Sequence, residues 1–284
     1  MSSGTDKLAS PGRVKEVTSL ANPIVKDIRA LFQKKHRDRQ RVFIAEGLKL
    51  IVDALDQGWT IRTLVHAKTA GDNVSQTAAR TVASGGDVLI VPEKTLGAIT
   101  RRDNPQMAIG VFGQRYQSLD EIKSAAGNVW VALDRVRDPG NLGTIIRTAD
   151  AVGASGIILI GDCTDPFSPE TVRATMGSVF SVPVARCGEA EFTAWARRAS
   201  VRLVGTHLEG AVDYREPVYG DGPIVLLMGN EQQGLTDELA GACETLVRIP
   251  QAGRADSLNL AVSCGVMLYE IRRDKLTLAG ENPA

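Results

Sequence analysis

The stretch that decides the fold is IVLLMGNEQQGL, from Ile224 to Leu235. It begins with five consecutive apolar residues, the pattern of a strand that is buried on both faces in a parallel sheet. Polar residues follow, together with Gly229 and Gly234, which indicates a loop that leads into a helix. In open α/β sheets ligands bind just outside the carboxyl ends of strands, so this loop is expected to border a binding crevice.

Two other segments repeat this order of strand, loop and helix. One is LDRVRDPGNLGTIIRTADAVGA, from Leu133 to Ala154, and the other is RIPQAGRADSLNLAVSCGVMLYEI, from Arg248 to Ile271. The alternation of strands and helices from residue 129 to 276 predicts a mostly parallel sheet with helices on both faces. Strands are expected at 129–133, 157–160, 202–206, 224–228 and 245–249, and helices at 143–152, 169–177, 189–200, 236–242 and 258–275.

Residues 19–115 predict a separate, small α/β domain, because helices and strands alternate there too. Helices are expected at 22–32, 46–57, 74–84 and 93–100, and strands at 61–66, 88–91 and 107–112. The polar stretch 116–128, with a helix expected at 119–126, is interpreted as a linker. Residues 1–18 and 277–284 are interpreted as flexible tails.

The three segments resemble, in order and spacing, the signature motifs of the SpoU (TrmH) family of RNA ribose 2′-O-methyltransferases, within the SPOUT superfamily. The resemblance implies a knotted α/β domain at 129–276, behind a small RNA-binding domain. It also implies methyl transfer from S-adenosylmethionine to a ribose 2′-hydroxyl. A knot violates the usual connection rules, so the pattern of elements alone would predict only a Rossmann-like sheet. The matching residues are Asn141, Gly143 and Arg147, then Gly229, Asn230, Glu231 and Gly234, then Ile249, Pro250, Ser257, Leu258 and Asn259.

The resemblance implies that backbone groups of the last two loops hold the adenosyl group, at Gly229, Ile249 and Leu258. Met228 and Thr206, at the ends of their strands, are expected to line the same crevice. A glycine at position 229 would allow the backbone to approach the ligand closely. The structural alternative is that Ile249 and Leu258 are ordinary core residues.

The catalytic group that the resemblance implies is Asn141, Arg147, Glu231, Ser257 and Asn259. A guanidinium stays protonated in proteins, so Arg147 is expected to orient the target nucleotide and stabilise developing negative charge rather than act as a base. Glu231 is expected to orient Arg147 or Asn141. The structural alternatives are a surface ion pair for Arg147, helix capping for Glu231 and Ser257, and a turn for Asn141.

The zero net charge hides an asymmetry along the chain. Residues 1–120 carry 18 Lys and Arg against 12 Asp and Glu, whereas the remainder carries 15 against 21. Basic side chains concentrate between residues 26 and 41, and a stripe of this kind can follow RNA phosphates. The alternative is a solvated helix face. The residues expected to contact RNA are Lys34, Lys35, Arg37, Arg39 and Arg41.

Several other classes of protein are disfavoured. No apolar run approaches the roughly 18–20 residues of a membrane helix, and the N-terminus lacks the apolar core of a signal peptide. Four widely spaced cysteines and three scattered histidines suggest neither disulfides nor a metal site, which fits a cytoplasmic protein. Neither G-x-G-x-x-G nor G-x-x-x-x-G-K-[ST] occurs, which argues against a nucleotide-binding dehydrogenase.

The most specific expectation is an enzyme that acts on rRNA, because the N-terminal domain loosely resembles a ribosomal-protein-like RNA-binding domain of this family. The alternatives are a tRNA 2′-O-methyltransferase and a non-catalytic RNA-binding or ribosome-assembly factor. A homodimer through the C-terminal domain is also expected, chiefly from the resemblance. The last helix has more apolar residues than one buried face needs: Leu260, Val262, Met267, Leu268 and Ile271.

Overall fold

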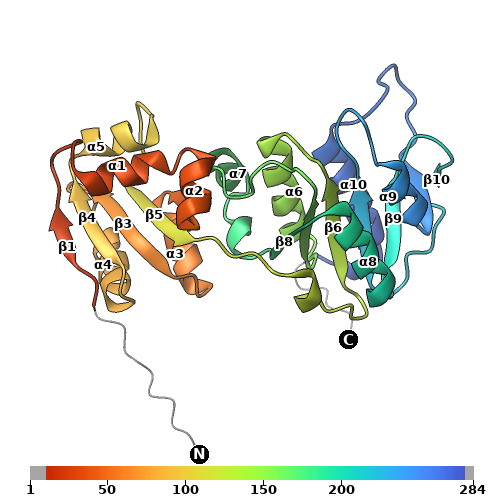
Figure 1. Cartoon of the computed structure of the whole chain (residues 1–284), viewed down its shortest axis with the longest axis horizontal. Helices are drawn as coiled ribbons and strands as arrows, with labels where there is room; N and C mark the ends of the chain where they lie inside the picture. Colours follow the sequence, from red (N-terminus) through yellow and green to blue (C-terminus); the bar gives the residue numbers. More distant parts are fainter. Residues whose placement is uncertain (1–10, 279–284) are drawn as a thin grey trace, which may run out of the picture. The chain divides into compact units, whose positions relative to one another are not determined.

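The computed structural model describes residues 11–278, and the chain divides into two compact units (Figure 1). The first unit runs to Gln114 and also includes the segment Phe167–Arg173. The second unit contains residues 115–166 and the chain from Ala174 onward. Nothing in the sequence pattern pointed to the assignment of Phe167–Arg173 to the first unit.

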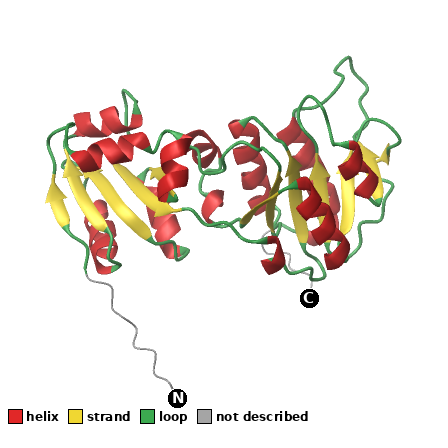
Figure 2. Cartoon of the chain, viewed as in Figure 1, coloured by secondary structure: helices red, strands yellow, loops and turns green. Residues whose placement is uncertain are grey.

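The first unit is a five-stranded sheet in the order β1-β4-β3-β5-β2, in which β5 runs antiparallel to both of its neighbours. Apolar residues of α1 and α5 pack on one face and form a core with the strands. Figure 2 shows helices against both faces of this sheet. Its elements are β1 (Val14–Glu16), α1 (Pro23–Ala30), α2 (Lys34–Gln40), β2 (Val42–Glu46), α3 (Leu48–Asp56), β3 (Ile61–Ala67), α4 (Asn73–Ala83), β4 (Asp87–Val91), α5 (Glu93–Thr100) and β5 (Ala108–Gly113).

Two strands of this sheet were missed from the sequence. The segment Val14–Glu16 lies in the expected tail 1–18 but pairs in parallel with β4, so part of that prediction is wrong. Residues 1–10 lie outside the described range. Val42–Glu46 pairs with β5, and four of its five residues are buried. The sequence interpretation started the following helix at residue 46 and gave this strand no assignment.

The second unit contains a seven-stranded sheet in the order β10-β12-β9-β11-β6-β7-β8, and every pairing within it is parallel. Side chains of β6 alternate between two cores: Val131 joins α6 and α10 on one face, and Trp130 joins α8 and α9 on the other. Its elements are β6 (Val129–Asp134), α6 (Pro139–Ala151), β7 (Gly156–Ile160), α7 (Pro169–Ala174, shared with the first unit), β8 (Val184–Cys187), α8 (Glu189–Ala199), β9 (Arg202–Thr206), β10 (Val212–Asp213), β11 (Ile224–Met228), α9 (Asp237–Ala242), β12 (Thr245–Arg248) and α10 (Leu260–Ile271), with short 3-10 helices at Leu119–Glu121, Ser178–Phe180 and Arg273–Lys275.

The expected helix at 119–126 is wrong, and the stretch interpreted as a linker belongs to the second unit. Only a 3-10 turn forms at Leu119–Glu121, and Leu119 and Ile122 are buried in the second unit's core. The strands β8 and β10, at the two edges of the sheet, were also missed. Several helix boundaries differ from those expected. The helix α7 ends at Ala174 rather than 177, α6 begins at Pro139 rather than 143, and α10 begins at Leu260 rather than 258.

The expected α/β class with a mostly parallel sheet is confirmed, whereas the knot remains an expectation from the family resemblance.

For function, the order of the strands in the second sheet matters most. Strands β12, β9, β11 and β6 are neighbours, and Val247, Thr206, Met228 and Leu133 stand at or near their carboxyl ends. The loops that carry all three motifs therefore leave the sheet on the same side, at the carboxyl ends of its strands.

Candidate active site

The first motif lies at the start of α6. Asp138 caps this helix, since its Oδ1 accepts a hydrogen bond from the backbone N–H of Asn141 at 2.6 Å, and Pro139 occupies the first helical turn. The sequence had suggested a loop position for Asn141, but the residue lies in the first turn of α6. The helix fixes the direction in which its amide points.

The second motif is a tight loop that closes on itself. Asn230 and Gly234 exchange two backbone hydrogen bonds of 3.0 Å, and the Asn230 Oδ1 accepts from the N–H groups of Gln232 and Gln233. A Cβ at position 229 would lie 2.3 Å from Gly234 C and Leu235 N. Gly229 is thus needed for the loop itself, and this is a stronger constraint than the expected approach to a ligand.

The third motif ends at the start of α10, where Asn259 is the N-cap. Its Oδ1 accepts from the N–H groups of Ala261 at 2.9 Å and Val262 at 3.3 Å. The structural alternative for Ser257, a helix cap, is therefore wrong. Ser257 is exposed and makes no hydrogen bond or ion pair with the described residues.

Side-chain amides join the three motifs into one arrangement. The Nδ2 of Asn259 donates to the Oδ1 of Asn141 at 2.9 Å, and the Nδ2 of Asn141 donates to Glu231 Oε1 at 3.3 Å. The groups at the two ends fix the direction of these hydrogen bonds. The Glu231 carboxylate can only accept, and the backbone N–H groups of α10, which bond to Asn259 Oδ1, can only donate. We call Asn259, Asn141 and Glu231 the amide link.

Glu231 also accepts hydrogen bonds from the backbone N–H groups of Arg137 and Asp138, each at 3.3 Å. It therefore binds to the amino end of α6, where a negative charge is favourable, rather than capping a helix near Leu235. Its expected contact with Asn141 is present, and no contact with Arg147 is. The carboxylate holds the second loop against the first motif.

Arg147 projects differently from Asn141. Six residues along a helix correspond to a rotation of about 240° and a rise of about 9 Å, so the two side chains leave α6 in different directions. The Arg147 side chain is exposed and forms no hydrogen bond or ion pair within residues 11–278. The alternative of a surface ion pair is thus wrong, and its role in the reaction stays a prediction.

The residues expected to bind the cofactor stand at the carboxyl ends of neighbouring strands or in the loops that follow them. Met228 is buried and Thr206 half-buried, with 3.6 Å between Thr206 Oγ1 and Met228 Sδ. Ile249 packs against the core, as its structural alternative required, whereas Leu258 is 38% exposed. Residues 249–258 make no hydrogen bond with the part of the chain that the structure describes, so their backbone C=O groups, and their N–H groups except at Pro250, can bond to a ligand.

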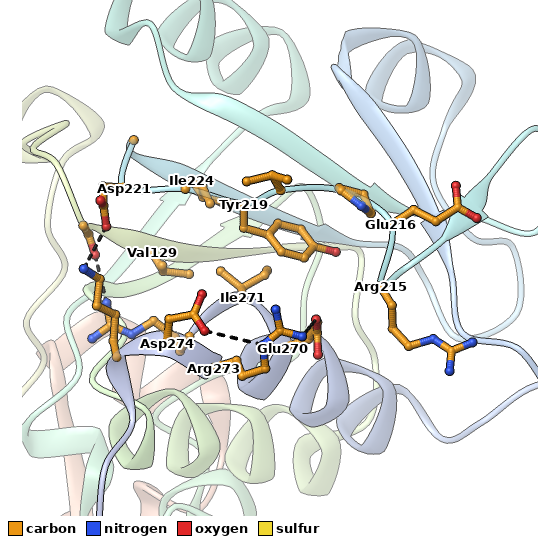
Figure 3. A pocket seen from close by; sticks show the side chains of 17 residues that line it. Val129, Arg215, Glu216, Tyr219, Asp221, Ile224, Glu270, Ile271, Arg273 and Asp274 are labelled. Atoms are coloured by element: carbon orange, nitrogen blue, oxygen red, sulfur yellow. Dashed lines mark hydrogen bonds and ion pairs between the residues drawn. The ribbon is translucent and has the colours of Figure 1, made fainter. Parts of the chain in front are cut away.

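A cavity of about 330 Å³ lies at the opposite side of the sheet, at the amino ends of its strands (Figure 3). Val129 and Ile224, the first residues of β6 and β11, line it, so it is remote from the three motifs. Some of its charged groups pair with one another, as in the 2.8 Å contact of Lys275 Nζ with Asp221. This cavity does not correspond to the predicted crevice.

The expected RNA-binding residues lie on and just after α2. Lys34, Lys35, Arg39 and Arg41 are exposed. Arg37 is only 3% exposed, and its Nη1 donates to the backbone oxygen of Leu31 at 2.8 Å, so its predicted contact with phosphate is wrong. Because α2 is a separate helix after α1, its register could not be extrapolated from the apolar pattern of 22–32.

Within residues 11–278 no group of side chains could hold a metal ion, and no helix is long and apolar enough to cross a membrane. Four cysteines have free thiols. Burial raises the pKa of Cys187 and of Cys264 to about 12, so these two thiols remain protonated at neutral pH.

Sequence comparisons identify both parts of the chain. The SpoU rRNA Methylase family matches residues 128–269, and the MRM3-like substrate binding domain matches residues 22–110. The chain belongs to the SpoU rRNA methylase family. The family, cofactor and reaction class expected from the three motifs are therefore confirmed.

Relatives of this SpoU family member extend over nearly its whole length. A 23S rRNA (uridine(2479)-2′-O)-methyltransferase from Streptomyces viridochromogenes is 33% identical, over 87% of this chain and 88% of its own. A 23S rRNA (guanosine(2553)-2′-O)-methyltransferase from Bacillus subtilis is 30% identical, over 91% and 100%. The crystal structure of an AdoMet-bound rRNA methyltransferase from Sinorhizobium meliloti is 65% identical, with a TM-score of 0.90, and covers 93% of this chain and 99% of that one.

The residues at the carboxyl ends of these strands of the SpoU domain fit an adenosyl group chemically. Adenine needs apolar contacts on its faces and hydrogen-bonding partners along its edge. Ile249 and Leu258 offer apolar side chains, and residues 249–258 offer unpaired backbone groups beside them.

One residue with several contacts at this edge was missed from the sequence. Arg135, directly after β6, bonds to Asp134 and to the second loop. No sequence signal distinguished it, because its partners in the second loop lie more than 90 residues away.

Proposed function

We propose that this chain methylates a ribose 2′-hydroxyl of rRNA, with S-adenosylmethionine as the methyl donor. The amide link carries the proposal, because it unites one residue from each motif at the edge where the cofactor loops begin. A non-catalytic RNA-binding factor would have no need for this arrangement.

S-adenosylmethionine supplies an electrophilic methyl group when it is bound. The task of the protein is then to place the ribose hydroxyl in line with that methyl, so that much of the rate comes from proximity and orientation. The amide link holds the amino ends of α6 and α10 and the second loop in one geometry. Such preorganised groups need not rearrange during the reaction.

Arg147 is proposed to engage the target nucleotide, through its phosphate or its 2′-oxygen. Its exposure and its lack of a partner among the described residues support this role, since the guanidinium remains available to an anionic ligand. A cation beside the sulfonium would be repelled, which favours the RNA side of the site. Ser257, exposed at the end of the third loop, is proposed to contribute there too.

The preference for rRNA over tRNA is supported by the named relatives and by the match of residues 22–110 to a substrate-binding domain. We propose that Lys34, Lys35, Arg39 and Arg41 contact the RNA backbone. All four are exposed, and none is held in an ion pair by the described residues. A cytoplasmic location belongs to the same proposal.

The deciding experiment maps 2′-O-methyl groups in rRNA and tRNA from a strain that lacks the gene. Purified protein with labelled S-adenosylmethionine should then restore one missing rRNA methyl group. Restoration of a tRNA position instead would identify the tRNA alternative. Cofactor binding without transfer to any RNA of the deletion strain, or no binding at all, would contradict the proposed enzyme.

A homodimer through α10 is part of this proposal. Val262 and Tyr269 are 53% and 55% exposed, and they lie seven residues apart, on one side of the helix. Burial of these side chains against a second copy would remove apolar surface from water. Light scattering should give twice the monomer mass at micromolar concentration, and Val262→Glu should shift it to the monomer. A monomeric unmodified protein would contradict the dimer.

A further inference from the structure

Arg135 is held in a backbone conformation that its side chain disfavours. Its φ is +50°, in the left-handed region where a Cβ meets the backbone and glycine is normally preferred. A non-glycine residue persists there only when its surroundings over-determine it, and such residues cluster at functional sites. The contacts of this side chain must therefore account for an arginine at this position.

The guanidinium faces the protein. Its Nε and Nη2 donate to the two carboxylate oxygens of Asp134, each at 2.9 Å, and the Asp134 side chain is 1% exposed. A bidentate pair of this kind fixes the plane of the guanidinium. The side chain is 28% exposed, so the pair is partly shielded from water.

Three other contacts of Arg135 reach both ends of the second loop. Its Nη1 donates to Gln233 Oε1 at 2.7 Å and its Nη2 to Gly234 O at 3.4 Å. Its backbone oxygen accepts from Asn230 Nδ2 at 2.8 Å. A single residue thereby ties β6 to the loop that carries Glu231.

We propose that Arg135 is a positioning residue for methyl transfer, which fixes the loop 229–234 so that Glu231 reaches Asn141 and the cofactor crevice keeps its shape. This inference rests on the proposed function for its kinetic consequence and on the contacts above for its structural one. The guanidinium donates to protein groups on its inner side and is not assigned a contact with substrate.

The test compares Arg135→Gly, Arg135→Lys and Gln233→Ala. Glycine fits the left-handed backbone but removes the whole fork, lysine keeps the charge without the bidentate geometry, and Gln233→Ala leaves the Asp134 pair intact. Arg215→Lys is the matched control, because Arg215 makes a similar bidentate pair with Asp213, at 2.9 and 2.6 Å, on an exposed surface outside the motifs.

Hydrogen exchange on the protein without cofactor gives the first readout. The amides of Asn230 and Gly234, which close the loop, should exchange at least about tenfold faster in Arg135→Gly, as expected for lost hydrogen bonds to a charged group. Arg215→Lys should leave them unchanged. This readout does not depend on activity, so it separates a failure of the inference from a failure of the proposed function.

Single-turnover transfer gives the second readout. Arg135→Gly should lose about tenfold or more in rate, Arg135→Lys less, and Gln233→Ala several-fold while its melting temperature changes little. Unchanged loop exchange, or normal transfer and cofactor affinity in Gln233→Ala and Arg135→Lys, would overturn the positioning role. If Arg135→Gly does not fold, the other two variants decide.

Discussion

Asn259 performs two tasks with one side chain, and a single substitution can separate them. Its Oδ1 caps α10, while its Nδ2 donates to Asn141. Asn259→Asp keeps an oxygen for the cap and adds a negative charge at a helix amino end, where it is favourable. A carboxylate cannot donate, so the amide link would be broken at its first hydrogen bond.

The magnitudes distinguish the two tasks. Asn259→Ala loses the cap and the link, at about 1–3 kcal/mol together, which corresponds to roughly 3–10 °C in melting temperature for a unit of this size. Asn259→Asp should shift the melting temperature by no more than about 2–3 °C. Its methyl transfer should nevertheless fall by about tenfold or more, because Glu231 would lose its oriented amide partner.

Thermal unfolding and single-turnover transfer, measured on the same preparations, give both quantities. Asn22→Asp is the matched control, since Asn22 caps α1 in the first unit through a 2.9 Å bond to Ile24 N. That variant should retain transfer. Normal transfer by Asn259→Asp would refute a catalytic role for the amide link.

Three other experiments test the remaining site assignments. Gly229→Val should abolish cofactor binding in calorimetry by breaking the loop, since its Cβ would lie 2.3 Å from backbone atoms, and retained affinity would contradict this. Charge reversal at Lys34 and Lys35 should weaken RNA binding and lower its salt slope by about 0.7–0.9 per lost phosphate contact. The same change at Arg80, which pairs with an aspartate, should have a smaller effect, and equal effects would argue against a specific surface. Arg147→Ala should lose about 10²-fold in transfer but keep cofactor affinity, and near-normal transfer would exclude its role.

The sequence was most informative where one local rule acted alone. The run Ile224–Met228 could only be a buried strand, and the structure has the same boundaries. The start of α6 was harder, because Asp138-Pro139 followed by Gly-Asn is both a turn signature and a helix cap with proline in the first turn. Only packing decides between them. The same ambiguity affected the start of α10, where Ser257, an equally good capping residue, was the alternative and Asn259 is the cap.

Two residues could not be assigned from the local pattern. The burial of Arg37 depends on the turn between α1 and α2, which turns its side chain towards the backbone oxygen of Leu31. The importance of Arg135 depends on hydrogen bonds with residues 98 and 99 positions away. Neither contact is visible in periodicity or composition. The three motifs could be recognised as related, but the hydrogen bonds that unite them required the fold.

The assignment of Phe167–Arg173 to the first unit has a consequence for dissecting the protein. Phe167 stacks on Phe43 at 4.7 Å, and Arg173 Nη2 lies 2.6 Å from Glu46, whose side chain is only 4% exposed. A fragment that stops at Gln114 would uncover an aromatic ring and leave a buried carboxylate without its nearest cation. The small unit is therefore discontinuous in sequence, and the chain must be synthesised well into the methyltransferase domain before this unit is complete. RNA binding by an isolated amino-terminal fragment would thus understate what the whole protein can do.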